Sequence, residues 1–399
     1  MADPLDSPPV FLTGASGFIG GKLAERLLAE GRRVRLLVRR PLPRLEALGA
    51  EIILGDLLDP ATLARGCAGA ATVFHVAGRV GVWGPADDFF RVNVEGTRQL
   101  LTAARAAGVP HFVFTSSPSV VYSGGSLSGV DESAPLCTAA PSPYPLTKAL
   151  AEHEVLAANT AAFSTVALRP HLVVGPGDQN LIPRVIARAR ARKLRIIGPG
   201  RNRVDVTSID NVVDAHLLAE CALANPPPAR STTTPAIVRP PTNPPAPMPA
   251  PIQAGSANPR LPTRPPLTIS PSAPAGTAAA GTAPPINRAR SAAGRAYFIT
   301  NGDPVVLWDW INELLRGIGV REVTSRVSLD MALLGGRALE TWWRVFKCAG
   351  DPPMTRFIAK ELCTEHWFDI SAARRDLGYN PRVSMAQVTA ELIALHRQR

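Results

Sequence analysis

The sequence predicts an α/β fold: a doubly wound parallel sheet with a smaller C-terminal lobe, interrupted by a proline-rich insertion. Short β-rich runs alternate with helical stretches rich in Ala, Leu and Arg from residue 10 to about residue 224, a pattern typical of parallel sheets. A glycine-rich turn follows the first of these runs. Nearly half of the 40 prolines lie between residues 226 and 294.

The expected strands of the first domain, residues 1–225, are 10–13, 34–38, 51–54, 73–76, 112–115 and 166–168. The first helix is expected at residues 21–30. After the insertion, residues 295–300 have the pattern of a strand, 306–318 that of an amphipathic helix and 328–348 that of a long helix. Because the folded pattern stops near Ala224 and resumes near Tyr297, both flanks of the insertion should meet in space.

We expect residues 226–294 to be disordered, because Pro, Ala, Thr, Ser and Arg dominate the segment and offer too little apolar surface to offset the entropy of ordering. We prefer the interpretation that this segment is a flexible surface loop with no specific function. A proline-rich docking site and a basic tether to an anionic surface stay open. Residues 295–399 then form the predicted substrate-binding lobe.

The charge of the chain does not indicate a nucleic-acid partner. The net charge is +11 and the pI is about 10.1, but seven arginines and no acidic residue stand between Pro226 and Gly302. The basicity therefore belongs mostly to one segment, and neither a basic helix nor an aromatic RNA-binding motif accompanies it. We expect no nucleic-acid binding.

The five cysteines are scattered and form no CxxC pair, so we expect neither a disulfide framework nor a metal site. A reducing, cytoplasmic location fits this usage. The N-terminus has no signal pattern, and no apolar run approaches the roughly 18–20 residues of a membrane span. Peripheral membrane contact through residues 328–348 stays open, with a lid or core helix preferred.

Gly14, Gly17 and Gly20 follow the first strand and predict a Rossmann-type dinucleotide site. Gly14 permits the tight turn, Gly17 lets the backbone approach a pyrophosphate, and Gly20 lets the helix pack on the strand. The helix N-terminus then holds the phosphates. The other residues of this turn expected to contact the cofactor are Ser16, Phe18 and Ile19.

The ends of the next strands indicate which dinucleotide binds. Arg39 and Arg40 follow the second strand, where a carboxylate would favour NAD and a guanidinium suits the 2′-phosphate of NADP. NADP(H) is therefore favoured, and NAD(H) stays open. Asp56 either accepts from the adenine amino group or caps a helix. His75 is expected to be a structural histidine, and the further expected cofactor contacts are Leu57, Val76, Ala77 and Gly78.

Tyr144 and Lys148 are four residues apart at the start of an expected helix, so both project from one face. A phenol is a poor acid at neutral pH, and a nearby ammonium should lower its pKa. We expect Tyr144 to exchange a proton with a carbonyl or alcohol oxygen while hydride is transferred. Lys148 should also hold the nicotinamide ribose.

The fifth strand ends at Thr115, which places Ser116 and Ser117 at the sheet edge where ligands bind. One serine hydroxyl can hydrogen-bond the substrate oxygen and stabilise developing charge. We expect Ser117 to be catalytic, with Ser116 as the alternative. Thr115 and Ser116 are also expected to contact the cofactor.

Residues 13–20, 115–117 and 144–148 resemble the extended short-chain dehydrogenase/reductase superfamily. Residues 93–97, 168–178, 205–211, 366–370 and 377–381 resemble its 3β-hydroxysteroid dehydrogenase branch, and residues 75–84 are similar to sterol-4-carboxylate dehydrogenases and bacterial 2-alkyl-3-oxoalkanoate reductases. The resemblance covers nearly all of the chain except residues 226–294. It implies homodimers, and it implies cofactor-side roles for Pro170, His171 and Val173.

The resemblance implies interconversion of a 3-oxo and a 3-hydroxy group on a bulky apolar substrate, and 2-alkyl-3-oxoalkanoate reduction is preferred. A 3β-hydroxysteroid dehydrogenase, with or without isomerase or decarboxylase activity, an epimerase and a non-catalytic dinucleotide sensor are the alternatives. Ser117 and Pro118 replace the acidic pair of sugar 4,6-dehydratases, which disfavours dehydration. The C-terminal lobe offers five aromatic residues that together would suit an apolar substrate, while each one taken singly is expected to be a core residue: Trp342, Trp343, Phe346, Phe357 and Trp367.

Overall fold

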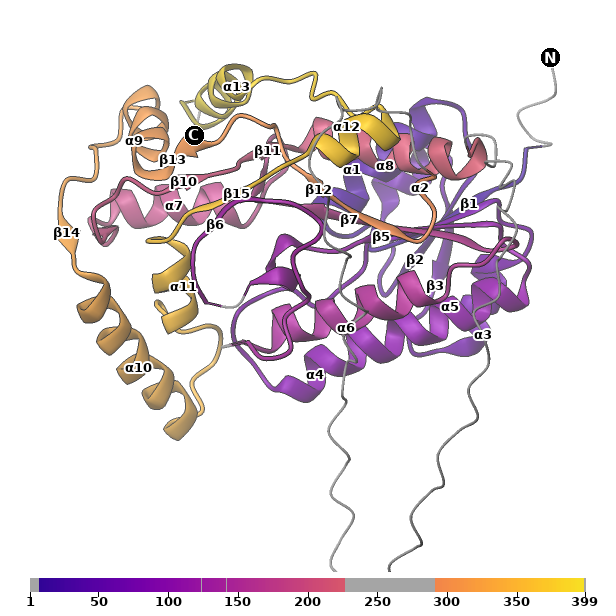
Figure 1. The fold of residues 1–399 in the computed structure, drawn as a ribbon, viewed down its shortest axis with the longest axis horizontal. Helices are drawn as coiled ribbons and strands as arrows, with labels where there is room; N and C mark the ends of the chain where they lie inside the picture. Colours follow the sequence, from indigo (N-terminus) through magenta and orange to yellow (C-terminus); the bar gives the residue numbers. More distant parts are fainter. Residues whose placement is uncertain (1–6, 123, 141, 227–290, 398–399) are drawn as a thin grey trace, which may run out of the picture. The chain divides into compact units, whose positions relative to one another are not determined.

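The computed structural model describes residues 7–122, 124–140, 142–226 and 291–397. Seven parallel strands form the central sheet in the order β12-β7-β5-β4-β1-β2-β3 (Figure 1). The strands are β1 (Val10–Thr13), β2 (Val34–Val38), β3 (Glu51–Leu54), β4 (Thr72–His75), β5 (His111–Thr115), β7 (Ser164–Pro170) and β12 (Arg295–Ile299). The order reverses between β1 and β4, and the predicted doubly wound α/β fold is confirmed.

Helices cover both faces of the sheet, so its strands are apolar on both sides. In β1, Val10 and Leu12 contribute to one hydrophobic core and Phe11 to the other, as the two-residue period of a strand requires. Figure 1 shows α1 (Phe18–Ala29), α8 (Ile209–Ala224) and α12 (Ser371–Leu377) on one face. The opposite face carries α3 (Pro60–Cys67), α5 (Gly96–Ala106) and α6 (Pro143–Ala157).

The two flanks of the insertion meet, as the sequence predicts. Leu223 at the end of α8 and Ala292 belong to the same hydrophobic core, and the Gly294 amide donates to the Thr165 carbonyl at 2.7 Å. The strand that follows, β12, pairs with β7 and completes the central sheet. The expected disorder of residues 226–294 falls almost wholly outside the described residues. The boundary of the lobe at residue 295 stays a prediction.

A smaller mixed sheet lies beside the central one in the order β13-β10-β15-β6. Its strands are β6 (Leu127–Val130), β10 (Arg203–Val204), β13 (Val305–Val306) and β15 (His366–Phe368), and two short parallel pairs join β8 (Val173–Val174) to β11 (Thr207–Ser208) and β9 (Ile196–Ile197) to β14 (Arg326–Val327). A third hydrophobic core unites α7 (Leu181–Arg190), α9 (Leu307–Gly317) and α13 (Met385–Arg397).

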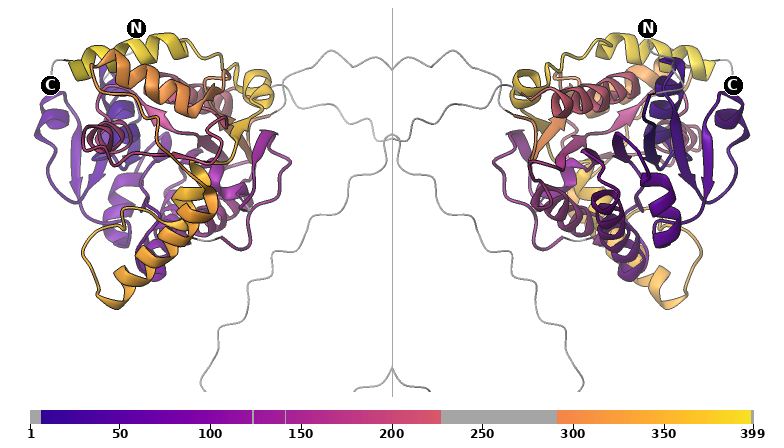
Figure 2. Two further views of the ribbon diagram at one scale, coloured as in Figure 1. Left: turned by 90° about the vertical axis from the view of Figure 1, so that its left-hand side faces the viewer. Right: turned by 90° about the vertical axis from the view of Figure 1, so that its right-hand side faces the viewer.

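Helix α10 (Leu329–Val345) packs against α11 (Arg356–Glu361), as both views in Figure 2 show. The remaining helices are α2 (Pro43–Ala47), α4 (Ala86–Phe90), a π-helical turn η2 (Arg91–Glu95) that joins α4 to α5, and a 3₁₀ turn η3 (Pro118–Val121). The expected helices at 306–318 and 328–348 are confirmed as α9 and α10. Helix α1 starts three residues before the expected position, because Gly17 is its N-cap.

A buried ion pair joins α6 to β7. The Arg169 guanidinium donates to both carboxylate oxygens of Glu152, at 3.0 and 2.5 Å, and the two residues are 3% and 0% exposed. Loss of one partner would leave the other charge buried and uncompensated, which costs far more than loss of an exposed pair.

We predict that Glu152→Ala lowers the free energy of unfolding by about 3–5 kcal/mol, measured by urea denaturation. Glu154→Ala is the matched control, since Glu154 lies on the same helix and pairs with the half-exposed Arg98; its cost should stay below about 1 kcal/mol. Equal effects of the two substitutions would contradict this assignment.

Candidate active site

A cavity of about 660 Å³ opens at the carboxyl ends of the central strands, where α/β sheets bind ligands. Apart from Arg40, every residue expected from the sequence to act in catalysis or cofactor binding lines it. From the first half of the sheet these are Gly14, Ser16, Gly17, Phe18, Ile19, Gly20, Arg39, Asp56, Leu57, Val76, Ala77 and Gly78, and from the second half Thr115, Ser116, Ser117, Tyr144, Lys148, Pro170, His171 and Val173.

The glycine turn has the shape of a phosphate cradle. Gly14 adopts a φ of +85°, and a Cβ there would stand 2.5 Å from the Ala77 nitrogen. A Cβ on Gly20 would stand 2.3 Å from the Gly14 carbonyl oxygen. Gly17 begins α1 without a side-chain cap, and the first turn of the helix carries no acidic residue. The N-terminus of α1 is therefore open to a pyrophosphate, and the turn fits a dinucleotide.

One cation and one carboxylate line the cavity beside the ends of β2 and β3, where the adenosine end of a dinucleotide is expected. Arg39 is exposed, follows β2 and lines the cavity, whereas Arg40 does not line it. Asp56 accepts a hydrogen bond from the Leu58 amide at 3.0 Å. The N-cap of α3 is Asp59, so the interpretation of Asp56 as a helix cap is wrong.

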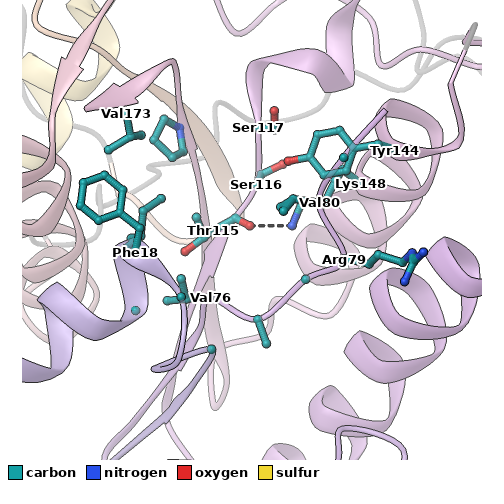
Figure 3. Close-up of a pocket in the computed structure, with 18 of the residues that line it drawn as sticks. Phe18, Val76, Arg79, Val80, Thr115, Ser116, Ser117, Tyr144, Lys148 and Val173 are labelled. Atoms are coloured by element: carbon teal, nitrogen blue, oxygen red, sulfur yellow. Dashed lines mark hydrogen bonds between the residues drawn. The ribbon is translucent and has the colours of Figure 1, made fainter. Parts of the chain in front are cut away.

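Helix α6 presents Tyr144 and Lys148 to the cavity together (Figure 3). Ser142 caps the helix by accepting from the Tyr144 amide, and Pro143 occupies its first turn. The Lys148 Nζ donates to the Thr115 carbonyl at 2.7 Å and lies 4.0 Å from the centre of the Phe114 ring. The helix end and the end of β5 are thereby joined beside the cavity.

The expected lowering of the Tyr144 pKa by Lys148 is wrong for this structure. Burial raises the pKa of Tyr144, and a hydrogen bond with the Ser117 side chain opposes that rise. Burial also lowers the pKa of Lys148 to about 7, against the attraction of Glu152. Desolvation outweighs the pairing expected from helical spacing, because Lys148 directs its ammonium to the Thr115 carbonyl.

Ser117 stands beside Tyr144 and Ser116 has a different environment (Figure 3). The Ser117 Oγ lies 2.9 Å from the Ser119 Oγ and caps η3. The Ser116 Oγ is buried and has no hydrogen-bond partner within the described residues. Ser117 is therefore placed to share a substrate oxygen with Tyr144, and the unpaired Ser116 hydroxyl is free to meet a ligand.

His75 has a structural environment, as expected. Its Nδ1 lies 2.8 Å from the Thr13 Oγ1 and its Nε2 lies 2.9 Å from the Thr97 Oγ1. Burial and the Lys148 charge lower its pKa to about 3. The neutral ring joins β1 to α5 behind the glycine turn.

Asn93 is a further residue of the site, and its role was not predicted from the sequence. This buried residue lies in the π-helical turn η2. Its Oδ1 accepts from the Arg79 amide at 2.7 Å, and its Nδ2 donates to the Arg79 carbonyl and the Thr147 Oγ1, both at 3.1 Å. Thr147 stands between Tyr144 and Lys148 in α6, so Asn93 ties this helix to the loop after β4. Position 93 lies in a motif quoted for the family resemblance, but its partners are distant in sequence.

The turn after β7 is strained where it lines the cavity. Leu172 adopts a φ of +37°, which is uncommon for a residue with a side chain. Thr207 clamps the turn: its Oγ1 donates to the His171 carbonyl at 2.5 Å, and its amide donates to the Leu172 carbonyl at 3.2 Å. Such strain is typical of functional sites.

Of the five aromatic residues considered for an apolar substrate, only Phe357 lines this cavity. The exposed rings of Trp342 and Phe346, at the end of α10, contact each other in a tilted arrangement with their centres 4.1 Å apart, and the Trp343 Nε1 donates to the Gly350 carbonyl. Trp367 lies beneath the Arg203 guanidinium. The apolar lining comes instead from positions that sequence periodicity does not single out: Val80, Val82, Val92, Tyr122, Leu127 and Phe368.

Within the described ranges, no helix is both long enough and apolar enough to cross a membrane.

Residues 11–235 match the model of the 3-beta hydroxysteroid dehydrogenase/isomerase family. A 2-alkyl-3-oxoalkanoate reductase of Stenotrophomonas maltophilia (strain K279a) is 36% identical over 381 residues, which span 95% of this chain and 96% of that protein. A 2-alkyl-3-oxoalkanoate reductase of Shewanella oneidensis is 35% identical over 94% of this chain and 83% of that protein. The structure of MoeE5 in complex with UDP-glucose and NAD is 25% identical, with a TM-score of 0.63 over 98% of this chain and 99% of that chain.

We predict that Gly14→Ala weakens dinucleotide binding by at least about 100-fold, because a methyl group would strike the Ala77 backbone and the left-handed conformation costs roughly 1–2 kcal/mol. The measurement is titration calorimetry with NADPH and NADH.

Gly31→Ala is the matched control for this substitution. Gly31 has a φ of +74°, and a Cβ added there would meet nothing within 4 Å, so the variant carries similar backbone strain without the clash. Its dinucleotide affinity should equal that of the wild type. Equal losses in the two variants would show that strain, and not the cradle, governs binding.

Proposed function

The chain belongs to the 3-beta hydroxysteroid dehydrogenase/isomerase family, an extended branch of the nicotinamide-dependent short-chain oxidoreductases, and from this premise we propose that it reduces the 3-oxo group of a 2-alkyl-3-oxoalkanoate, with NADPH as the preferred cofactor. The proposal rests mainly on one observation: Tyr144, Ser117 and Lys148 line the same cavity as the glycine turn. The names of the two bacterial relatives supply the substrate class.

Tyr144 acts as the proton donor. A bound reduced nicotinamide dinucleotide supplies the hydride to the carbonyl carbon. The Tyr144 hydroxyl gives its proton to the carbonyl oxygen, and the Ser117 hydroxyl, which stands beside Tyr144, orients that oxygen and stabilises the charge that develops on it. The product is the 3-hydroxy acid, and Tyr144 is left as a phenolate.

Lys148 balances the charge that Tyr144 acquires. Its pKa of about 7 allows it to exist as an ammonium at neutral pH, one helical turn from the phenol. An ammonium beside a newly formed phenolate lowers the free energy of that state. The buried cation therefore acts most strongly after proton transfer, when the phenolate has formed, which is the condition for an interaction that accelerates a reaction.

Arg39 supports the proposed preference for NADPH. Within the described residues it makes no ion pair, and it lines the adenosine end of the cavity. A free guanidinium can form charge-assisted hydrogen bonds with a 2′-phosphate. NADH is the competing cofactor, because the structure of MoeE5 was solved with NAD.

A 3β-hydroxysteroid is the second candidate substrate, because the matching family model carries that name. Its reaction would need the same proton transfer through Tyr144 and the same hydride transfer with the cofactor. An epimerase would keep its cofactor unchanged through the cycle, and a dinucleotide sensor would bind the cofactor without turnover. A screen of NADPH and NADH oxidation over 3-oxo acids and 3-oxosteroids separates the two dehydrogenase candidates from each other and from the epimerase and the sensor.

We predict that Tyr144→Phe lowers kcat by about 10²–10⁴-fold, because the ring stays and the transferable proton is lost. Dinucleotide affinity should not change. Tyr379→Phe is the control, since Tyr379 is buried away from the cavity and donates to the Thr300 carbonyl. Undiminished NADPH oxidation by Tyr144→Phe with a 3-oxo acid would refute the assigned role.

We predict that Arg39→Ala lowers the ratio of kcat/KM for NADPH to that for NADH by roughly ten- to hundredfold, the value of a hydrogen bond to a charged group. The adjacent Arg40→Ala should leave the ratio unchanged, because Arg40 does not line the cavity. A wild-type enzyme that turns over NADH more efficiently than NADPH would refute the cofactor assignment.

A further inference from the structure

A second group of polar side chains lines the cavity, and the mechanism above does not use it. Glu361 comes from the end of α11, His366 from β15 and His171 from the turn after β7. We call these three residues the polar wall. The Glu361 Oε1 lies 3.5 Å from the His366 Nε2, and the rings of His366 and His171 meet edge to face with their centres 6.0 Å apart.

The hydrogen bonds of the polar wall leave room for a ligand. The Thr364 Oγ1 donates to the Lys360 carbonyl at 2.9 Å, so it accepts from the His366 Nε2, also at 2.9 Å. The proton of the neutral His366 ring is thereby placed on Nε2. The His171 Nε2 is buried and has no hydrogen-bond partner in the described part of the chain. An unpaired buried nitrogen on a cavity wall indicates a polar group of a bound molecule.

Burial favours the uncharged forms of the three residues of the polar wall. Burial lowers the pKa of His171 to about 3 and that of His366 to about 4. Burial raises the pKa of Glu361 to about 8, so at pH 7 its carboxyl group keeps a proton and can donate a hydrogen bond. A metal ion is not the expected occupant, since no group of three or more His, Cys, Asp and Glu side chains in the described residues is placed to hold one.

We propose that the polar wall binds the carboxylate of a 3-oxo acid, with the Glu361 carboxyl group and the His171 Nε2 as its hydrogen-bond partners. This inference rests on the proposed function, and it names the residues that would recognise the acid group of the substrate. An O–H donor to a carboxylate forms a strong, charge-assisted hydrogen bond. The carboxylate in turn supplies the partner that the His171 nitrogen lacks.

The place of the polar wall in the fold suits this substrate. Leu168 in β7 pairs with Thr115 in β5. His171 follows the end of β7, and Ser117 follows the end of β5. Neighbouring strands lie about 4.8 Å apart, so both residues leave the same edge of the sheet. A single carbon separates the carboxyl carbon of a 3-oxo acid from its oxo carbon, so one small head group can reach Tyr144 and the polar wall together.

The polar wall also distinguishes between the two candidate substrates. The carbons on either side of the oxo group of a 3-oxosteroid carry no oxygen. A steroid would bury the polar wall against hydrocarbon and leave the His171 nitrogen unpaired. The polar wall therefore favours the 3-oxo acid.

The test uses the full-length enzyme in the oxidative direction with NADP⁺, where the substrates are stable. One substrate is a 2-alkyl-3-hydroxyalkanoic acid, and the other is the matching secondary alcohol with hydrogen in place of the carboxyl group. The variants are Glu361→Gln, which keeps an N–H donor, and Glu361→Leu, which removes it. Glu365→Gln is the control, since Glu365 is partly exposed, accepts a hydrogen bond from Ser128 and does not line the cavity.

We expect Glu361→Leu to lower the ratio of kcat/KM for the acid to that for the alcohol at least tenfold, Glu361→Gln to restore most of it, and Glu365→Gln to leave it unchanged. NADP⁺ affinity and the melting temperature of each variant report on folding. Equal changes for acid and alcohol, or none, would overturn the polar wall as a carboxylate site while the proposed function stands. A wild-type enzyme that oxidises neither compound but oxidises a 3β-hydroxysteroid would overturn both.

Discussion

The site depends on how this protein buries the ammonium group of Lys148. The residue is 4% exposed, and an isolated buried cation is costly. Three neighbours share the compensation: the Thr115 carbonyl, the face of the Phe114 ring and the Glu152 carboxylate one turn further along α6. The last of these is itself held by Arg169 in β7. The charge of one lysine thus ties together α6, β5 and β7, the elements whose ends form the catalytic half of the cavity.

That arrangement explains why the lysine does not acidify the tyrosine as helical spacing suggests. Four residues of separation place two side chains on one face, but the spacing does not fix where the ammonium points. Here it points to the end of β5, and burial acts on both groups in the same direction, toward their neutral forms. The charge effect between them becomes important only when proton transfer creates a phenolate.

Sequence reasoning succeeded where the relevant information is local. The glycine turn, the Tyr144–Lys148 spacing and the serines after β5 are each set by a few consecutive residues, and all of them line one cavity. It failed where the partners are distant: Asn93 holds Thr147, Thr207 holds the strained turn at Leu172, and Glu361 reaches His366 and, beyond it, His171. The aromatic residues of α10 misled for a related reason, since composition does not reveal which face of a helix meets the cavity.

The closure of the central sheet by β12 has a consequence for biosynthesis. Strand β5, which pairs with one edge of β7, is synthesised long before the ribosome reaches residue 295. Strand β12, which pairs with the other edge, begins only at that residue. The 64 residues from 227 to 290 take about 3–13 s to translate at typical rates. During that interval a seven-residue strand keeps an open hydrogen-bonding edge, the kind of edge that recruits other chains. The nascent protein therefore passes through a period in which a chaperone has a defined surface to shield.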